Sequence, residues 1–239
     1  MKGQVALVTG ASSGIGRAIA VALAQKGARV CVVGRNGAAL AETASAAMEF
    51  SEVDQFRMDL TVEENVQALA RNLQHEGGRL DVLVHSAGVI HQGSMERGEV
   101  ADLDLQYATN VRAPYVLTQK LLPLLTSSRG QVVFVNSSAG LSAKNPGIGQ
   151  YAATKHALRA IADSLREEVN ARGVRVLSVY AGRTATPLQK ALFERQGLSY
   201  KPEILLQPED VASVVVHALM LPPTAEVTDV SIRPMQKSY

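Results

Sequence analysis

Short runs of apolar, β-branched residues alternate along the chain with longer segments of helix-like composition or periodicity. The short runs are typical of strands and the longer segments of amphipathic helices. The predicted strands are Val5–Thr9, Val30–Val33, Gln55–Met58, Val82–His85, Val132–Asn136, Val174–Tyr180 and Val227–Ile232. The predicted helices are Ile15–Gln25, Asn36–Ala47, Val62–His75, Val100–Leu125, Tyr151–Arg172 and Pro208–Leu219.

This alternation predicts one parallel sheet. Strands separated by helices cannot pair as hairpins, so they pair in parallel through right-handed crossovers. The strands are apolar on both faces, which is typical of a sheet covered by helices on either side. No repeat or linker divides the 239 residues, and this length suits one domain with a large core. We therefore predict a single α/β domain over residues 1–239, with a doubly wound parallel sheet of about seven strands.

Residues 184–207 interrupt the pattern. They contain no predicted strand, mix polar and apolar positions, and exceed an ordinary connection in length. An insertion late in such a fold lies near the carboxyl ends of the strands, where ligands bind. Two interpretations stay open, a substrate lid and a variable surface excursion.

A glycine-rich turn follows the first predicted strand, with the sequence Gly10-Ala11-Ser12-Ser13-Gly14-Ile15-Gly16. Glycines permit a tight turn and let the backbone approach a pyrophosphate, and the following helix presents free N–H groups and a positive dipole end. The spacing G-x-x-x-G-x-G differs from the G-x-G-x-x-G fingerprint. Its place between the first strand and the first helix nevertheless favours a dinucleotide-binding turn over a purely structural one.

The end of the second predicted strand indicates which dinucleotide is bound. An acidic side chain there accepts hydrogen bonds from the ribose 2′-OH, whereas an arginine accommodates a 2′-phosphate. This chain has Arg35 at that point and no carboxylate before Glu42. Because a guanidinium pairs with a phosphate through charge-assisted hydrogen bonds, NADP(H) is favoured over NAD(H).

Tyr151 and Lys155 lie four residues apart, so they share one helix face. The same face continues through apolar residues that should pack on the sheet, and lysine is rarely buried without a partner. A phenol and an ammonium group are therefore expected beside the carboxyl ends of the strands, next to the glycine-rich turn. The apolar residues of this face are Leu158, Ala162, Leu165 and Val169.

This pair suits carbonyl reduction, which needs a hydride on carbon and a proton on oxygen. A nicotinamide supplies the hydride, and a general acid must supply the proton. An ammonium roughly 4 Å from a tyrosine, at an effective dielectric of about 20, favours the phenolate by about 4 kcal/mol, or about 3 pKa units, before desolvation. We predict that Lys155 lowers the pKa of Tyr151 towards neutrality, provided that no carboxylate neutralises the lysine.

These segments together resemble the short, single-domain branch of the short-chain dehydrogenase/reductase family, with its Rossmann-like fold, over nearly the whole chain. The family's glycine motif corresponds to Thr9–Gly16, and its Tyr-x-x-x-Lys motif to Tyr151–Lys155. The family's serine, which orients the substrate, stands thirteen positions before the tyrosine, and this spacing selects Ser138 over Ser137. The asparagine of its tetrad falls on Asn110 and implies a water-mediated proton relay beside Lys155.

The resemblance also implies a set of cofactor contacts. Lys155 binds the nicotinamide ribose, and Asp59 lies at the adenine ring. The implied cofactor-binding residues are Gly10, Ser12, Ser13, Gly14, Ile15, Gly16, Arg35, Asp59, Leu60, Ala87, Gly88, Tyr151, Lys155, Gly182, Thr184 and Thr186.

Three features depart from the family pattern. His85-Ser86 replaces a pair of asparagines, which changes their side-chain hydrogen bonds. Ala181 replaces a proline, which is expected to loosen that turn. The chain ends shortly after Pro234, without a glycine-rich segment that many relatives use in tetramers. The resemblance therefore leaves a tetramer in doubt and implies a homodimer through Val100–Leu125 and Tyr151–Arg172.

Composition excludes several other classes of partner. The 24 basic and 22 acidic residues leave a net charge of +2, which gives no reason to expect nucleic acid or an anionic membrane. The longest apolar run, Val211–Leu221, is too short to span a bilayer. The five histidines and the lone Cys31 lack ligand-like spacing, so no metal is expected. We expect a cytoplasmic protein with a buried, structural thiol.

The sequence thus predicts an oxidoreductase that transfers a hydride between NADP(H) and a small-molecule carbonyl or secondary alcohol, with Tyr151 as general acid and base. Two alternatives stay open. One is a dinucleotide-binding sensor or structural relative without turnover, and the other is an epimerase or dehydratase on the same scaffold. The residues do not identify the substrate, although the scarcity of charge in the predicted pocket segments suggests a small to medium, mostly apolar carbonyl.

Overall fold

The computed structural model describes residues 1–75 and 77–236. Its centre is a seven-stranded sheet in which every neighbouring pair is parallel, in the order β3-β2-β1-β4-β5-β6-β7. The predicted doubly wound α/β domain is confirmed. The strands are β1 (Val5–Thr9), β2 (Arg29–Gly34), β3 (Val53–Arg57), β4 (Val82–His85), β5 (Gln131–Ser137), β6 (Arg175–Ala181) and β7 (Asp229–Ile232).

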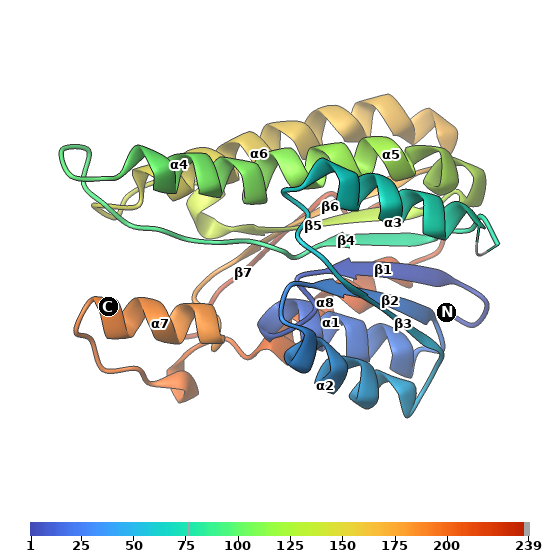
Figure 1. The fold of residues 1–239 in the computed structure, drawn as a ribbon, viewed down its shortest axis with the longest axis horizontal. Coiled ribbons are helices and arrows are strands. Elements are labelled where there is room, and N and C mark those ends of the chain that lie inside the picture. The colour runs from blue at the N-terminus through green and yellow to red at the C-terminus, as the bar shows by residue number, and fades with distance from the viewer. Residues whose placement is uncertain (76, 237–239) are drawn as a thin grey trace.

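Helices cover both faces of the sheet, as Figure 1 shows. The helices are α1 (Gly14–Gln25), α2 (Gly37–Met48), α3 (Glu63–His75), α4 (Val100–Tyr107), α5 (Ala113–Ser128), α6 (Gly149–Val169), α7 (Pro187–Arg195) and α8 (Pro208–Leu219). Helices α1, α2 and α8 lie on one face and α3, α4, α5 and α6 on the other, while α7 projects beyond the carboxyl edge.

Two hydrophobic cores follow from the alternation of side chains along the strands. Ala6 and Val8 of β1 point into the core beneath α1, α2 and α8. Leu7, between them, points into the core beneath α3, α5 and α6. The same alternation recurs in β2 and β4, so the central strands are apolar on both faces because each face is covered.

The carboxyl ends of β1 and β4 form the place where a ligand can enter. The chain moves outward from β1 to β2 and β3 on one side, and from β4 to β7 on the other. Crossovers on opposite sides leave a crevice at this point in doubly wound sheets. Thr9 pairs with Val33, and Val8 pairs with Val84. The turns that follow these strands therefore begin at the same edge.

Two segments differ in kind from the predicted elements, while the other bounds shift by three residues at most. The predicted helix Val100–Leu125 is divided by a π-helical turn, Ala108–Arg112, a feature frequent at functional sites. Residues 184–207 contain α7 and a short 3-10 turn at Pro202–Ile204. Pro187 stands in the first turn of α7, and Thr186 caps it by accepting the Gln189 N–H at 3.2 Å. Capping and proline thus start a helix whose weak apolar periodicity did not predict it.

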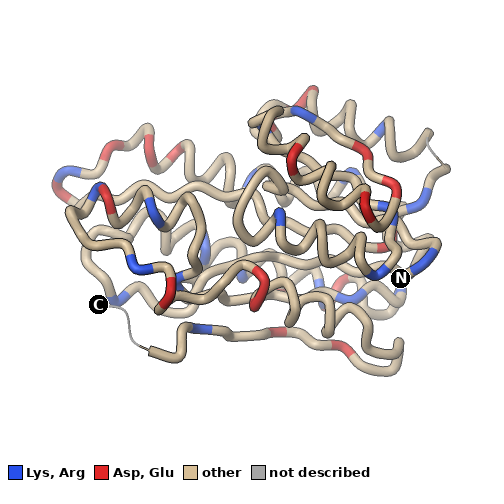
Figure 2. Tube along the Cα trace, turned by 90° about the horizontal axis from the view of Figure 1, so that it is seen from below, with Lys and Arg blue, Asp and Glu red and all other residues tan. Residues whose placement is uncertain are grey.

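Basic and acidic residues are interspersed along the elements visible in Figure 2. Within residues 1–75 and 77–236, no helix is long and apolar enough to cross a membrane.

Candidate functional site

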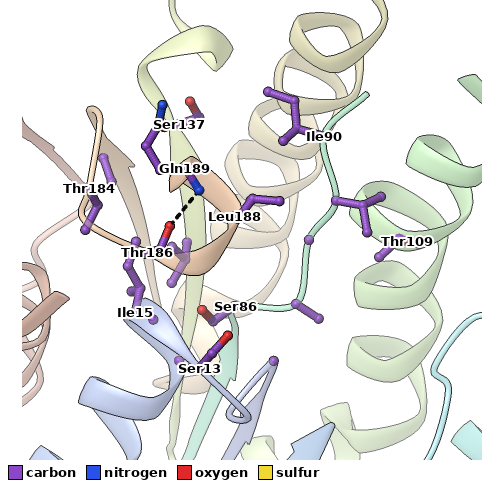
Figure 3. A pocket seen from close by; sticks show the side chains of 18 of the residues that line it. Ser13, Ile15, Ser86, Ile90, Thr109, Ser137, Thr184, Thr186, Leu188 and Gln189 are labelled. Atoms are coloured by element: carbon purple, nitrogen blue, oxygen red, sulfur yellow. Dashed lines mark hydrogen bonds between the residues drawn. The ribbon is translucent and has the colours of Figure 1, made fainter. Parts of the chain in front are cut away.

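A cleft of about 460 Å³ lies at the carboxyl edge of the sheet. Figure 3 shows its walls converging: Ser13 and Ile15 come from the glycine-rich turn, and Ser86 and Ile90 from the segment after β4. Residues of the α7 segment face them. The predicted site residues that line the cleft are Gly10, Ser12, Ser13, Gly14, Ile15, Gly16, Arg35, Asp59, Leu60, Ala87, Gly88, Ser138, Tyr151, Lys155, Gly182, Thr184 and Thr186.

The glycine-rich turn requires glycine for steric reasons. Gly10 and Gly14 have φ angles of +65° and +54°, in the left-handed region. A Cβ on Gly10 would lie 2.6 Å from the backbone nitrogen of Ala87. A Cβ on Gly16 would collide with the carbonyl oxygen of Gly10. The turn is therefore folded tightly against the end of β4, and any larger residue would force these segments apart.

Thr9 joins the two strands that border the cleft. Its hydroxyl accepts hydrogen bonds from the N–H groups of Ser86 and Ala87, at 3.1 and 3.2 Å, and donates to the carbonyl of Val84 at 3.3 Å. The backbone of Ala87 and Gly88 is thereby held beside the glycine-rich turn, where a flat ligand can lie against it.

The turn fits the pyrophosphate of a dinucleotide. Helix α1 begins at Gly14, and its N-cap Ser13 makes no side-chain cap hydrogen bond, which leaves N–H groups of the first turn open. Ser12 has a buried hydroxyl with no hydrogen-bond partner among the described residues. Free donors, a positive helix end and close glycine backbone are the features that bind phosphate groups. The residues present therefore fit the cofactor that the sequence predicts.

Arg35 and Asp59 form the far end of the cleft. An Arg35 Nη1 lies 3.9 Å from an Asp59 Oδ2, and 60% of the arginine side chain is exposed. Burial alone would raise the pKa of Asp59, but hydrogen bonds from Thr61 and the charge of Arg35 lower it below its usual value. Asp59 is thus ionised and partly balances Arg35, whose exposed guanidinium stays accessible to an anion.

Helix α6 brings Tyr151 and Lys155 to the cleft. The predicted stripe is buried from Lys155 onward, with Leu158 and Ala162 against the sheet. Lys155 Nζ donates to the Val135 carbonyl at 3.2 Å and lies 5.8 Å from the centre of the Tyr151 ring. Asn136 Nδ2 donates to the Lys155 carbonyl at 3.1 Å, which fixes the first turns of α6 against β5.

The acidity of Tyr151 differs from the prediction. Burial raises the pKa of Tyr151 above its ordinary value of 10.0, and a hydrogen bond to the Ser137 side chain offsets only part of that increase. Burial lowers the pKa of Lys155 to about 8. In the protein without cofactor, desolvation of the phenol therefore dominates, and the lowering through Lys155 that the sequence predicts is not seen.

Ser137 and Ser138 occupy different surroundings. Ser137 ends β5, is half-buried and hydrogen bonds to Tyr151. Ser138 starts a 3-10 turn and is exposed, although it also lines the cleft. The hydroxyl beside the phenol therefore belongs to Ser137, not to Ser138, which sequence spacing selected. Counting back thirteen positions from Tyr151 takes no account of the length of the loop between the serine and the tyrosine. The end of β5 identifies the serine directly.

Asn110 lies behind the cleft wall, in the π-helical turn. Its Oδ1 accepts from the Val89 N–H at 2.9 Å, and its Nδ2 donates to the Val89 carbonyl at 2.9 Å and to the Thr154 hydroxyl at 3.1 Å. The side chain thus connects the segment after β4 to α6. A Cβ on Gly88 would lie 3.4 Å from Asn110 Oδ1 and 3.9 Å from Lys155 Nζ, so the three residues are close neighbours.

The two substitutions noted in the sequence have separate consequences. His85 points away from the cleft, where it stacks on Phe134 and its Nε2 lies 2.8 Å from the Thr118 hydroxyl. Burial lowers the pKa of His85 to about 3, so the ring is neutral. The turn after Ala181 is held by a hydrogen bond in which the Gly182 N–H donates to the Ile232 carbonyl at 2.8 Å. Within the described part of the chain, no three His, Cys, Asp or Glu side chains gather as a metal site would require.

The chain is similar to known proteins over nearly its whole length. A family model described as short chain dehydrogenase matches residues 4–197. An uncharacterized oxidoreductase of Staphylococcus epidermidis is 34% identical over 236 residues, which cover 98% of this chain and 99% of that protein.

Solved structures share the fold and were determined with nicotinamide cofactors of both kinds. An alcohol dehydrogenase of the archaeon Thermococcus sibiricus, complexed with 5-hydroxy-NADP, has a TM-score of 0.88 and 25% identity, with 99% of each chain covered. A metagenomic short-chain oxidoreductase in complex with NADP has a TM-score of 0.83 and 31% identity, again with 99% of each chain covered. A 3-ketoacyl-(acyl-carrier-protein) reductase of Brucella melitensis, complexed with NADH, has a TM-score of 0.82 and 26% identity, covering 96% of this chain and 97% of that one.

Proposed function

The chain belongs to the short-chain dehydrogenase/reductase family of oxidoreductases, and from that premise we propose that it transfers a hydride between NADP(H) and a carbonyl compound or secondary alcohol. Tyr151 acts as the general acid and base. The observation that carries this proposal is that Tyr151 and Lys155 line the same cleft as the glycine-rich turn. Measuring NADPH oxidation over a panel of aldehydes, ketones, quinones and keto-sugars tests it.

Each part of the cofactor has residues suited to it. The glycine-rich turn and the start of α1 would hold the pyrophosphate, Arg35 and Asp59 the adenosine end, and Lys155 the nicotinamide ribose. Once bound, NADPH supplies the hydride. Gly182, Thr184 and Thr186 form the opposite wall, and the N-cap contact of Thr186 holds that wall in place.

The protein's own residues supply the proton. Because burial raises the pKa of Tyr151, the phenol is protonated at neutral pH. This state suits donation to an alkoxide, which is a far stronger base than a phenolate. Lys155 stabilises the phenolate left behind, and Asn110, tied to Val89 and Thr154, keeps the surrounding backbone in place for proton return.

Ser137 orients the substrate carbonyl. Its hydroxyl hydrogen bonds to Tyr151, so one carbonyl oxygen can meet both groups. Changing Ser137 to alanine should lower kcat by about 10²-fold, the cost of losing one donor at a developing oxyanion. The matched variant Ser138→Ala should keep most of its activity. Steady-state kinetics of both variants checks this assignment, and the reverse ranking would return the role to Ser138.

Arg35 selects NADP(H) over NAD(H). Arg35→Asp should shift the ratio of NADPH to NADH dissociation constants towards NADH by about 10- to 100-fold, since a charged hydrogen bond is worth about 1.5–3 kcal/mol. Titration with each cofactor measures the ratio. Arg71→Asp, an equal charge change on an exposed residue of α3, is the control. An unchanged ratio in Arg35→Asp would show that Arg35 does not bind the 2′-phosphate.

The assembly we propose is a homodimer through α4, α5 and α6. Large apolar side chains are exposed along α4 and α5, including Val100, Tyr107 and Tyr115, at 69%, 53% and 52%. Patches of this kind mark interaction surfaces. We place the protein in the cytoplasm, since a chain with one cysteine, Cys31, cannot form an intramolecular disulfide, and disulfides are rare in reducing compartments.

A further inference from the structure

The cleft around Tyr151 combines an apolar wall with a group of carboxamides. Three segments contribute to it: the one after β4, the loop between β5 and α6, and the α7 region. Its aliphatic residues are Ile90, Ile148, Leu188 and Leu192, and its carboxamides are Gln92, Asn145, Gln189 and Gln196.

Two of these carboxamides meet across the mouth of the cleft. Gln196 Nε2 donates to Gln92 Oε1 at 2.8 Å. Gln92 comes from the segment after β4, and Gln196 follows directly on the last residue of α7. The contact therefore joins residues 104 positions apart in sequence, from opposite walls of the cleft.

Gln92 is held in place by both of its neighbours. The His91 N–H donates to Gln106 Oε1 at 3.0 Å, and the Gly93 N–H donates to the Gly147 carbonyl at 2.9 Å. Gln106 is fully buried, and its Nε2 donates in turn to Gln150, the residue before Tyr151, at 3.3 Å. The position of Gln92 is thus set relative to the phenol, which distinguishes it from an ordinary exposed glutamine.

Gln196 is positioned by α7. Its N–H donates to the Leu192 carbonyl at 3.1 Å, and Leu192 and Phe193 are buried at 6% and 5% exposure. The helix is therefore packed against the molecule along this side. Both members of the pair extend from ordered backbone and are accessible to a ligand at the mouth of the cleft.

Charge is scarce at this end of the cleft. Among the described lining residues around Tyr151, other than Lys155, only Arg183 is charged, and its guanidinium lies over the Phe193 ring at 5.5 Å. A carboxylate or phosphate group is normally recognised by the fork of an arginine or by a lysine. An anion held by the carboxamides of Gln92 and Gln196 alone would keep its charge uncompensated, so these two residues favour a neutral group, and the keto acid in the test below shows whether Arg183 compensates an anion instead.

We propose that Gln92 and Gln196 form a specificity pair that binds a neutral carbonyl compound carrying a hydroxyl group away from the reacting carbon. A carboxamide both donates and accepts, and after their mutual hydrogen bond each still has unused sites. A hydroxyl also does both, so it matches the pair, while the rest of the substrate lies on Ile90 and Leu192. This inference rests on the proposed function, and it replaces the mostly apolar substrate that the sequence suggested.

Matched ketones test this specificity. A series of methyl ketones with a hydroxyl at successive chain positions is compared with the unsubstituted ketone and the keto acid of equal length. The best hydroxyketone should exceed both in kcat/KM by about 10-fold, because it adds two hydrogen bonds of modest net strength. In Gln92→Leu and Gln196→Leu this preference should fall to nearly 1, whereas Gln119→Leu, on the exposed surface of α5, should retain it.

The outcomes separate this inference from the proposed function. Preference for the keto acid or the unsubstituted ketone would overturn the specificity pair and leave hydride transfer intact. A hydroxyketone preference that survives both leucine variants would also overturn it. Failure to reduce any compound with NADPH would overturn both.

Discussion

Tyr151→Phe should lower kcat for NADPH-dependent carbonyl reduction by about 10³-fold, within the range of about 10²- to 10⁴-fold that a positioned general acid supplies. The substitution removes one oxygen atom from a half-buried ring and leaves the glycine-rich turn untouched. The NADPH dissociation constant should therefore change little. Single-turnover kinetics with titration of NADPH fluorescence measures both quantities.

The matched control is Tyr200→Phe, which removes the same atom from a half-buried tyrosine that lies outside the cleft lining and outside the helices proposed for the dimer. It should leave kcat unchanged. If Tyr151→Phe keeps its rate, another group donates the proton, and if it loses NADPH binding as well, its effect is on the cofactor site and not on the chemistry.

Lys155→Met should remove most activity and yet stabilise the protein without cofactor. Burial lowers the pKa of Lys155 from 10.5 to about 8, a difference equivalent to about 3 kcal/mol of destabilisation at neutral pH. The variant also loses the hydrogen bond to the Val135 carbonyl, and this loss offsets about 1 kcal/mol of the gain in stability. The free energy of unfolding at pH 7 should rise by about 2 kcal/mol, as measured by urea denaturation.

The gain should depend on pH in a defined direction. Below pH about 8 Lys155 is protonated in both the folded and the unfolded chain, so the full penalty is present. Between pH 8 and 10.5 the unfolded chain binds the extra proton, so the wild type gains stability with rising pH and the advantage of Lys155→Met shrinks. Lys120→Met, at an exposed site of α5, should show neither effect. A destabilised Lys155→Met would contradict the cost assigned to this buried charge.

Much of the fold could be predicted from the sequence because local and tertiary preferences agree. The strands β1 and β4 begin and end where the apolar runs do, since both of their faces are buried and any polar residue marks the end. Helix α8 likewise matches its prediction from Pro208 to Leu219. The division of Val100–Leu125 was not predicted, because a π-helical turn depends on contacts such as those of Asn110 with Val89 and not on periodicity.

The sequence could predict which residues form the candidate site, but not which serine contacts Tyr151 or how the pKa of Tyr151 is shifted. Motif spacing brought together the glycine-rich turn, Tyr151 and Lys155, because each follows directly from a strand end or a helix face. The choice between Ser137 and Ser138 depended on loop length, which spacing does not reveal. The pKa of Tyr151 depended on desolvation. A sequence shows which residues are available as partners of a side chain, but it does not show how deeply that side chain is buried.

The most direct test of the account follows a labelled hydride. NADPH carrying deuterium at the transferable position of the nicotinamide is incubated with the wild type and a reactive ketone, and the alcohol is analysed by mass spectrometry. We expect deuterium on the carbinol carbon with the wild type, and about 10³-fold less labelled product per unit time with Tyr151→Phe. Unlabelled alcohol, or equal labelling rates with the two proteins, would contradict hydride transfer assisted by Tyr151.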